Sequence, residues 1–459
     1  MKKIFRHLSF LIVLFLLMFP PSFSNNKIEE KQEINQDIAV KWAKKTLEFI
    51  NEQPNKTPTF ISRTLAYTGI VMYESVVNSS DKYQSIALQI NGLGALPKPE
   101  IGKNYDWKIV LNAGQSKILR LLWQPLKSDY NRISGRLSIS KLDSLEIAIL
   151  RQRECFVEDT ATVNRSIKFG KMIADYIYRW SMTDGGHEMN YQNFDPNYKF
   201  PKGEGYWIPP LKGQSPVLMP LHPHWGKNRT FVKANNDLAI AKIIPYSKDT
   251  SSACYKQFKQ IYDIQKNLTQ EQKEIANWWG DDPAFTTAPP GHSYWLAMTI
   301  LKNKKSDMVV SAMVFAKVGM ACAEAFINCW KNKYTYHSER PAEYIKANID
   351  KKFVQYWPEP PFPGFPSGHS TQMAATTEVL ISVFGDNTDI EDNMYQGRAK
   401  DDVRKVEYKN RRFNKISEIA EECGISRLYG GIHTMQDNLV GLEEGKKIGE
   451  NINRIHWKK

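Results

Sequence analysis

Apolar residues recur at three- and four-residue spacing along most of the chain, which is the period of an amphipathic α-helix. Alternating patterns, which are typical of half-buried strands, are scarce. We therefore expect an all-α protein built from helical bundles. The predicted helices cover residues 38–51, 62–77, 107–123, 142–156, 164–181, 252–266, 269–279, 298–330, 371–384, 414–422 and 432–455.

Two long segments lack this period. Residues 182–230 are rich in Gly, Pro and Trp and are predicted to form an irregular connection, and long ordered connections often line functional sites. Residues 386–412 are highly charged but lack the alternating ligand spacing of a calcium-binding EF-hand, so we expect a solvated loop. We expect an N-terminal helical region at 25–235 and a C-terminal helical domain, carrying the functional site, at 236–459.

The first 24 residues have the parts of a secretory signal peptide. Three basic residues precede an apolar run at 8–19, and small residues suited to cleavage follow at 22–24. We expect an exported protein, periplasmic or secreted, and an uncleaved N-terminal anchor is the alternative. The most apolar later segment, 308–330, contains Lys317 and Glu324, so it is predicted to be a buried helix rather than a membrane span.

The composition narrows the class of partner. The 459 residues include 62 Lys and Arg against 49 Asp and Glu, a formal net charge of +13, and the 42% apolar content is ordinary for a globular protein. A disordered or collagen-like chain is therefore excluded. The positive charge suits nucleic acid, an anionic surface or a small oxyanion. Because the sequence has no nucleic-acid-binding motif and no basic stripe interleaved with aromatics, we expect no nucleic-acid partner.

Two motifs place cations and helix amides where an oxyanion can bind. Lys333 falls at the end of a long apolar helix, and Pro341 keeps Arg340 out of helical conformation, so both cations can face one cavity. A Pro-rich lead-in is followed by Ser367, Gly368 and His369, which open the next helix. The first amides of a helix lack backbone acceptors and favour negative charge. Alone, the first motif is more typical of two solvated surface cations, and the second is equally typical of a Ser N-cap with an incidental His.

The third motif pairs a histidine with a carboxylate. Arg427 precedes a Gly-Gly break, and His433 and Asp437 follow at i and i+4 on one face of the expected last helix. A carboxylate in that position can hold one ring nitrogen and aim the other, which gives an oriented nucleophile or ligand. Alone, the pair is more typical of helix stabilisation.

Together, in the order K-x6-R-P, P-S-G-H and S-R-x5-H-x3-D, the motifs resemble the signature of the type 2 phosphatidic acid phosphatase superfamily, which includes the vanadium-dependent haloperoxidases. The resemblance is best over residues 278–455. It implies one vanadate per chain, with its metal bonded to His433, and it implies that His369 acts as acid–base. It also implies that Asp437 orients His433 from behind. The groups that would bind the rest of the oxyanion are Lys333, Arg340, Arg427, Ser367 and Gly368.

Several residues favour the haloperoxidase branch. Phe362 and Trp330 fall where fungal-type chloroperoxidases have the same residues. The segment from Trp278 to Asp282, together with that from Pro289 to His292, is similar to a bacterial haloperoxidase segment. The Asp of that family segment pairs with the Arg that corresponds to Arg427, and both Asp281 and Asp282 are candidates.

This branch implies oxidation of halide, with iodide or bromide favoured, by hydrogen peroxide, which Lys333 would polarise. Phosphate would compete for the site. The sequence predicts no oligomeric state.

The motifs leave two alternatives open. An exported acid phosphatase would use His433 as the nucleophile that forms a phosphohistidine and His369 as the acid that protonates the leaving group. A non-enzymatic oxyanion-binding protein is the other alternative, but binding alone does not need two oriented histidines.

Overall fold

The computed structural model describes residues 38–123, 129–157, 159–281, 286–287 and 289–459. Its central element is helix α12, Met308–Tyr336, whose residues are buried on almost every side because the sequence is apolar all round. Helix α4, Pro58–Val76, packs along it. Gly69 and Gly319 lie at this crossing, where an added Cβ would meet the partner helix's backbone at 2.5 Å. Both glycines therefore permit the close approach of the two helices.

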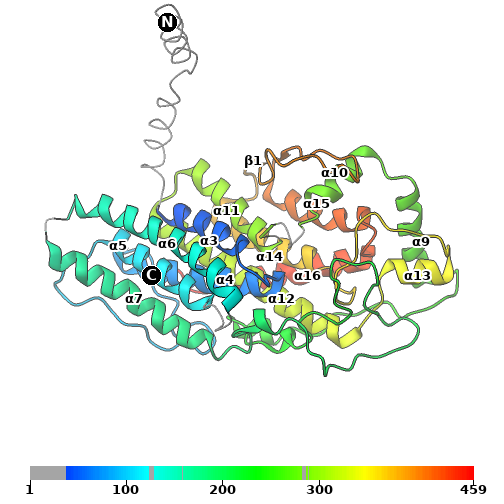
Figure 1. Ribbon diagram of the computed structural model, residues 1–459, viewed down its shortest axis with the longest axis horizontal. Helices are drawn as coiled ribbons and strands as arrows, with labels where there is room; N and C mark the ends of the chain where they lie inside the picture. The colour runs from blue at the N-terminus through cyan, green and yellow to red at the C-terminus, as the bar shows by residue number, and fades with distance from the viewer. Residues whose placement is uncertain (1–37, 124–128, 158, 282–285, 288) are drawn as a thin grey trace, which may run out of the picture. The chain divides into compact units, whose positions relative to one another are not determined.

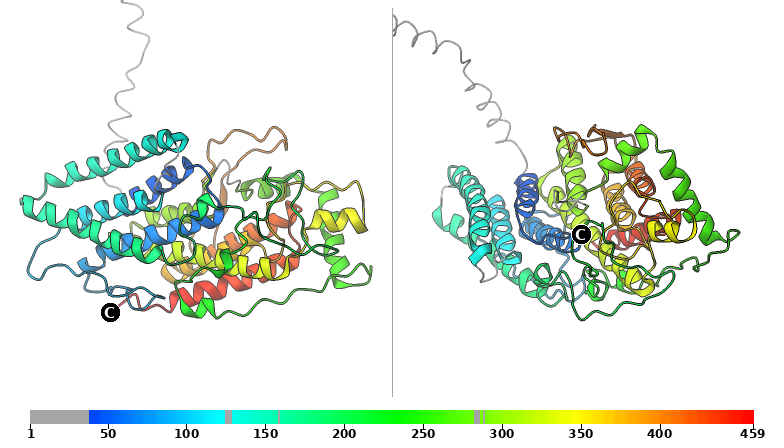
Figure 2. Two further views of the ribbon diagram at one scale, coloured as in Figure 1. Left: turned by 60° about the horizontal axis from the view of Figure 1, so that its bottom comes forward. Right: turned by 45° about the vertical axis from the view of Figure 1, so that its right-hand side comes forward.

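The N-terminal helices form one group around α4, with α5 packed between α6 and α7 (Figure 1). The same cyan to green helices stay together in both views of Figure 2. Aspartate side chains cap the first turns of two of them, Asp106 at α5 and Asp159 at α7, by accepting hydrogen bonds from free amides. The other helices of this part are α3 (Ile38–Asn51), α5 (Trp107–Leu122), α6 (Asp129–Glu154) and α7 (Thr160–Ser181).

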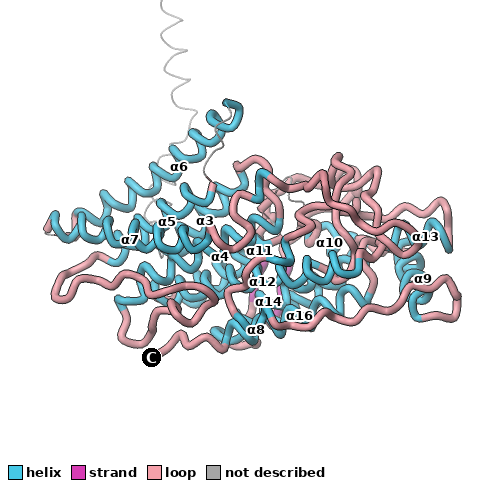
Figure 3. The backbone as a smooth tube through the Cα atoms, turned by 90° about the horizontal axis from the view of Figure 1, so that it is seen from below, coloured by secondary structure: helices cyan, strands magenta, loops and turns pink. Residues whose placement is uncertain are grey.

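The C-terminal helices also pack on α12. Helix α14 contacts α12, α15 and α16, and loops gather around α9, α10 and α13 (Figure 3). The described part of the chain has two strands, β1 (Ile390–Asp392) and β2 (Arg411–Phe413), which are short and pair antiparallel. The helices are α8 (Lys233–Asn236), α9 (Ala253–Lys266), α10 (Gln270–Trp278), α11 (Pro290–Lys304), α13 (Pro341–Asn348), α14 (Gly368–Phe384), α15 (Ile416–Tyr429) and α16 (Met435–Asn453).

The predicted all-α class is confirmed. Contacts group Ile38–Lys459 into one compact unit, and the predicted boundary at residues 235 and 236 stays a prediction. The predicted signal peptide lies outside the described residues. Within them, α12 is the one helix long and apolar enough to cross a membrane, and 94% of its most apolar window is buried inside the protein. Residues 182–230 are irregular as predicted, with 3-10 turns at Met189–Tyr191 and Trp225–Lys227.

Several boundaries differ from the sequence pattern. Helix α6 begins at Asp129, 13 residues before the predicted start, and helix α13 was not predicted. The predicted helix 298–330 is two helices, because Lys305 adopts a left-handed conformation with φ of 49° and Asp307 caps a new helix. The predicted helix 414–422 continues to Tyr429 as α15. The last helix starts only at Met435, after the N-cap Thr434, so His433 lies in the preceding turn and not on the helix.

Candidate active site

The second and third motifs line one cavity of about 230 Å³, and the first motif is hydrogen-bonded to both of them beside it. Lys333 comes from the last turn of α12, Arg340 caps α13, Ser367 caps α14, Arg427 lies on α15, and His433 lies just before α16. Helix ends converge here, so charged groups and free amides collect in one place. Motif residues that line the cavity directly are Phe362, Gly368, His369, Arg427 and His433.

The Lys333 ammonium is completely buried. Its Nζ donates hydrogen bonds to the carbonyl oxygens of Pro363 at 2.7 Å and Gly364 at 2.5 Å. Burial, with the charge of Arg340 nearby, lowers the pKa of Lys333 to about 7. Lys333 therefore holds the lead-in to α14 and can change protonation near neutral pH.

Arg340 joins two of the motifs. Its Nε donates to the Phe362 carbonyl at 3.0 Å, and its Nη1 donates to the Ile432 carbonyl at 2.8 Å. The same Nη1 lies 3.4 Å from Nε2 of His433. Because a guanidinium can only donate hydrogen bonds, Nε2 of His433 is the acceptor in this contact.

The other ring nitrogen of His433 faces a carboxylate. Nδ1 lies 3.0 Å from Oδ2 of Asp437, which also accepts the Thr434 amide at 3.0 Å. Burial and the charges of Arg340 and Lys333 hold the pKa of His433 well below its usual value. The ring is therefore neutral with its proton on Nδ1, and the Nε2 lone pair is left as nucleophile or ligand.

Ser367 and His369 lie at the start of α14. The Ser367 hydroxyl accepts from the Ser370 amide at 3.3 Å and caps the helix. Within the described part of the chain, Nε2 of His369 is buried without a hydrogen-bond partner. Burial and the charge of Arg427 hold the pKa of His369 well below its usual value, so it is a neutral base. An oxygen acid entering the cavity would find this nitrogen free.

Arg427 is buried, and its Nη1 donates to the carbonyl of Trp279. Its Nε has no described partner, and burial lowers its pKa to about 10. The Asp281 carboxylate is near but is used elsewhere, with Oδ1 bonded to Tyr395 and Oδ2 3.8 Å from Nε2 of His369. Asp282 lies outside the described residues, so the carboxylate that pairs with Arg427 stays a prediction.

A buried ion cluster behind His369 was missed by sequence reasoning. His292 lies between Asp281, 3.1 Å from its Nδ1, and Asp392, 2.7 Å from its Nε2. Burial acts to lower its pKa, but the charges of Asp392 and Asp281 outweigh burial and raise the pKa of His292 to about 10. Asp392 also accepts from Trp278 Nε1 at 2.7 Å. The expectation that Asp392 lies in a solvated loop is therefore wrong, because strand β1 turns it inward.

Aromatic residues form one wall of the cavity. Phe362 packs on Trp330 with ring centroids 4.8 Å apart, and the ammonium of Lys333 lies 5.3 Å from the Phe362 centroid. The irregular connection 182–230 also lines the cavity, as its composition predicted. Residues from the turn before α4 also line the cavity, and no motif announced them. The lining residues before and at the start of α4 are Lys56, Thr57 and Pro58, and those of the irregular connection include Asn193, Phe194, Gln214 and Ser215.

The donor set fits a small oxyanion. Among the residues that the structure describes, Lys333, Arg340 and Arg427 form no salt bridge with a carboxylate. Lys333 and Arg340 donate to carbonyl oxygens beside the cavity, and Arg427 lines it. No group of three or more His, Cys, Asp or Glu side chains suited to caging a metal ion occurs in the described ranges. An anion bonded to the single nitrogen of His433 and surrounded by donors matches this geometry.

Comparison with known proteins agrees with these motifs. Residues 313–457 match the family described as the VCPO second helical-bundle domain. No curated protein matches the chain. The crystal structure of the first bacterial vanadium-dependent iodoperoxidase is similar, with 27% identity, a TM-score of 0.76, and coverage of 91% of this chain and 96% of that chain. The apo and holo structures of a bacterial vanadium-dependent chloroperoxidase share the fold, at 13% and 14% identity, a TM-score of 0.62, and coverage of 88% and 89% of this chain and 95% of theirs.

Proposed function

We propose that this chain, which shares its fold and its C-terminal domain with vanadium haloperoxidases, is itself a vanadium-dependent haloperoxidase that oxidises halide with hydrogen peroxide. The observation that carries the proposal is the neutral His433, which lines the cavity together with the buried Arg427 and has the buried Arg340 3.4 Å from its Nε2. This arrangement suits a bond from one imidazole to an oxyanion's central atom. It would be costly for a site that binds nothing, because buried cations without carboxylate partners are destabilising.

The residues present fit vanadate. His433 would supply the single protein ligand, Lys333, Arg340 and Arg427 would balance the negative charge, and Ser367 with the Gly368 amide would complete the cradle. The orphan Nε of Arg427 and Nε2 of His369 are the polar atoms that such a group would satisfy. When bound, vanadate supplies a Lewis-acidic centre that activates peroxide for two-electron oxidation of halide.

The chain's own residues then manage protons and water. His369 is neutral and accepts a proton at Nε2 as hydrogen peroxide enters. Lys333, whose pKa is about 7, donates a hydrogen bond or a proton to the peroxide oxygen. Asp437 keeps the proton of His433 on Nδ1, so that Nε2 stays a ligand. Phe362 and Trp330 exclude water from this side of the cavity.

Iodide is the favoured substrate in this proposal, and bromide is next. The support is the similarity to a bacterial iodoperoxidase at 27% identity, about twice the identity to the chloroperoxidase. Phosphate would compete with vanadate for the same donors. We further propose that the protein acts after export, in the periplasm or outside the cell.

The test compares two chemistries in one preparation. The protein is purified without phosphate and loaded with orthovanadate, and peroxide-dependent oxidation of iodide, bromide and chloride is measured beside hydrolysis of a phosphomonoester. We expect vanadate-dependent oxidation of iodide. Because the same residues would form a phosphohistidine, rapid ester hydrolysis without vanadate-dependent halide oxidation would replace this proposal with an acid phosphatase.

A further inference from the structure

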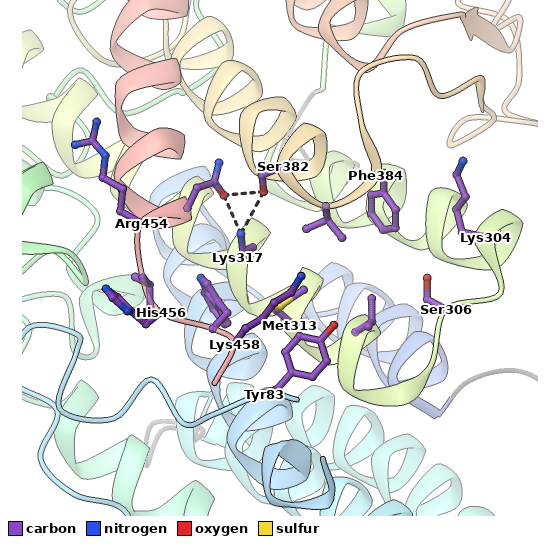
Figure 4. A pocket seen from close by; sticks show the side chains of 15 residues that line it. Tyr83, Lys304, Ser306, Met313, Lys317, Ser382, Phe384, Arg454, His456 and Lys458 are labelled. Carbon is purple, nitrogen blue, oxygen red and sulfur yellow. Dashed lines mark hydrogen bonds between the residues drawn. The ribbon is translucent and has the colours of Figure 1, made fainter. Parts of the chain in front are cut away.

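A second cavity, of about 720 Å³, lies between the first half of α12, the end of α14 and the segment after α16 (Figure 4). Lys317 of α12 forms part of its wall, 16 residues before Lys333 and therefore about 24 Å from it along the helix. Cations from three other places also line it, and its lining residues include no Asp or Glu. These cations are Lys304, Arg454 and Lys458.

Lys317 is buried, with 6% of its surface exposed. Its Nζ donates to Asn453 Oδ1 at 2.9 Å and to Ser382 Oγ at 3.2 Å, and these two side chains are bonded to each other at 2.8 Å (Figure 4). An ammonium has three N–H groups, so one remains for another acceptor. Among the described residues, no carboxylate forms an ion pair with Lys317, whose strongest charged neighbour is Lys458.

This position is unusual for lysine. Lysine is almost never fully buried unless it is paired, and the other residues of α12 from Ala312 to Ala323 are buried and apolar. A methionine or leucine of similar size would avoid the desolvation cost. Burial, together with the charge of Lys458, lowers the pKa of Lys317 to about 8, so it still carries a proton at neutral pH. The charge is therefore available to a ligand that enters the cavity.

The remaining wall is apolar and aromatic. Met313, Phe384 and Trp457 line the cavity, and the Lys317 ammonium lies 5.5 Å from the Trp457 ring centroid. We propose that this cavity binds an organic carboxylate, with the carboxylate on the Lys317 ammonium and an apolar body against Met313, Phe384 and Trp457. Lys458 and Lys304, which are exposed, add attraction at the rim. The site is separate from the haloperoxidase site, and it requires no cofactor.

Benzoate and its neutral analogue benzamide test the proposal on the full chain. Isothermal titration should show benzoate bound at least tenfold more tightly than benzamide, because only benzoate carries a negative charge that pairs with the Lys317 ammonium. The Lys317→Met variant should lose about ten- to hundredfold in benzoate affinity. Lys446→Met, on the exposed side of α16 and outside the cavity, should bind benzoate as the unchanged protein does.

A second measurement does not need a variant to fold identically. NMR of the protein with 13C- and 15N-labelled, unmodified lysines should show the pKa of Lys317 rising when benzoate is added, and not when benzamide is added. Equal binding of benzoate and benzamide, no benzoate binding at 10 mM (about the limit of useful affinity), or tighter binding of inorganic phosphate than benzoate would each overturn the proposal. Because Lys317→Met should keep halide oxidation, these outcomes are distinct from failure of the proposed function.

Discussion

Replacing His292 by Gln should destabilise the fold substantially, because it removes the one cation between two buried carboxylates. The imidazole is fully buried, bonded to Asp281 at 3.1 Å and to Asp392 at 2.7 Å, and stacked on Trp279 with a centroid distance of 4.5 Å. Glutamine can keep one hydrogen bond but carries no charge. Both carboxylates would then remain in the interior without the cation that contacts them.

The magnitude follows from the raised pKa. A rise from 6.5 to about 10 corresponds to about 5 kcal/mol, at roughly 1.4 kcal/mol per pKa unit. Breaking a buried ion pair typically costs about 3–5 kcal/mol, which agrees. Because the pKa is raised in the folded state, the stabilisation is complete below about pH 6.5 and is lost as pH rises through about 10. Its slope between these values is about 1.4 kcal/mol per pH unit.

Urea unfolding of the unchanged protein and His292→Gln at pH 6, 7, 8 and 9 measures this effect. We expect the free energy of unfolding to differ by about 3–5 kcal/mol at pH 6, and the difference to shrink steadily above pH 7. His456→Gln, at an exposed histidine, is the matched control and should change little. A His292 difference below about 1 kcal/mol, or one that does not change with pH, would refute the reasoning.

Three further predictions concern the site and the core. Asp437→Asn should weaken vanadate binding about ten- to hundredfold in equilibrium dialysis, because the Nδ1 proton of His433 loses its carboxylate acceptor; unchanged binding would remove Asp437 from that role. Lys333→Met should lower vanadate-dependent iodide oxidation at least tenfold. In the unchanged protein, phosphate affinity should fall between pH 6 and 8 as Lys333 loses its proton, and this fall should be smaller in the variant. An identical pH profile of phosphate inhibition in the two proteins would contradict this. Gly319→Ala should destabilise the protein by about 1–3 kcal/mol in urea unfolding, since its Cβ would lie 2.5 Å from the Leu65 carbonyl oxygen, and a neutral effect would show that α4 and α12 can separate freely.

The helical architecture could be predicted because the apolar period is strong wherever a helix face is buried. The break between α11 and α12 could not, because the apolar pattern resumes in phase and Lys305 adopts its left-handed conformation without a glycine or proline to announce it. The late start of α16 was also missed. His433 and Asp437 keep the predicted contact although only Asp437 is helical, since the Thr434 cap places them together.

Much of the candidate site could also be predicted, because its residues lie in three short motifs whose family resemblance the comparisons confirm. The ion cluster around His292 could not. Asp392 is 100 positions away from His292, and in the sequence it belongs to a charged stretch that is typical of a solvated loop. Only the pairing of β1 with β2, three residues each, turns Asp392 toward the interior. The sequence motifs also give no sign that the buried Lys317 ammonium keeps one N–H for a ligand.

The central claim is that His433 holds the vanadate on which halide oxidation depends. Titrating orthovanadate into the phosphate-free protein, while measuring peroxide-dependent iodide oxidation, tests it most directly. We predict that activity rises and saturates at one vanadate per chain, and that His433→Ala neither retains vanadate nor gains activity. A His433→Ala protein that binds vanadate tightly and oxidises iodide at the unchanged rate would contradict the account.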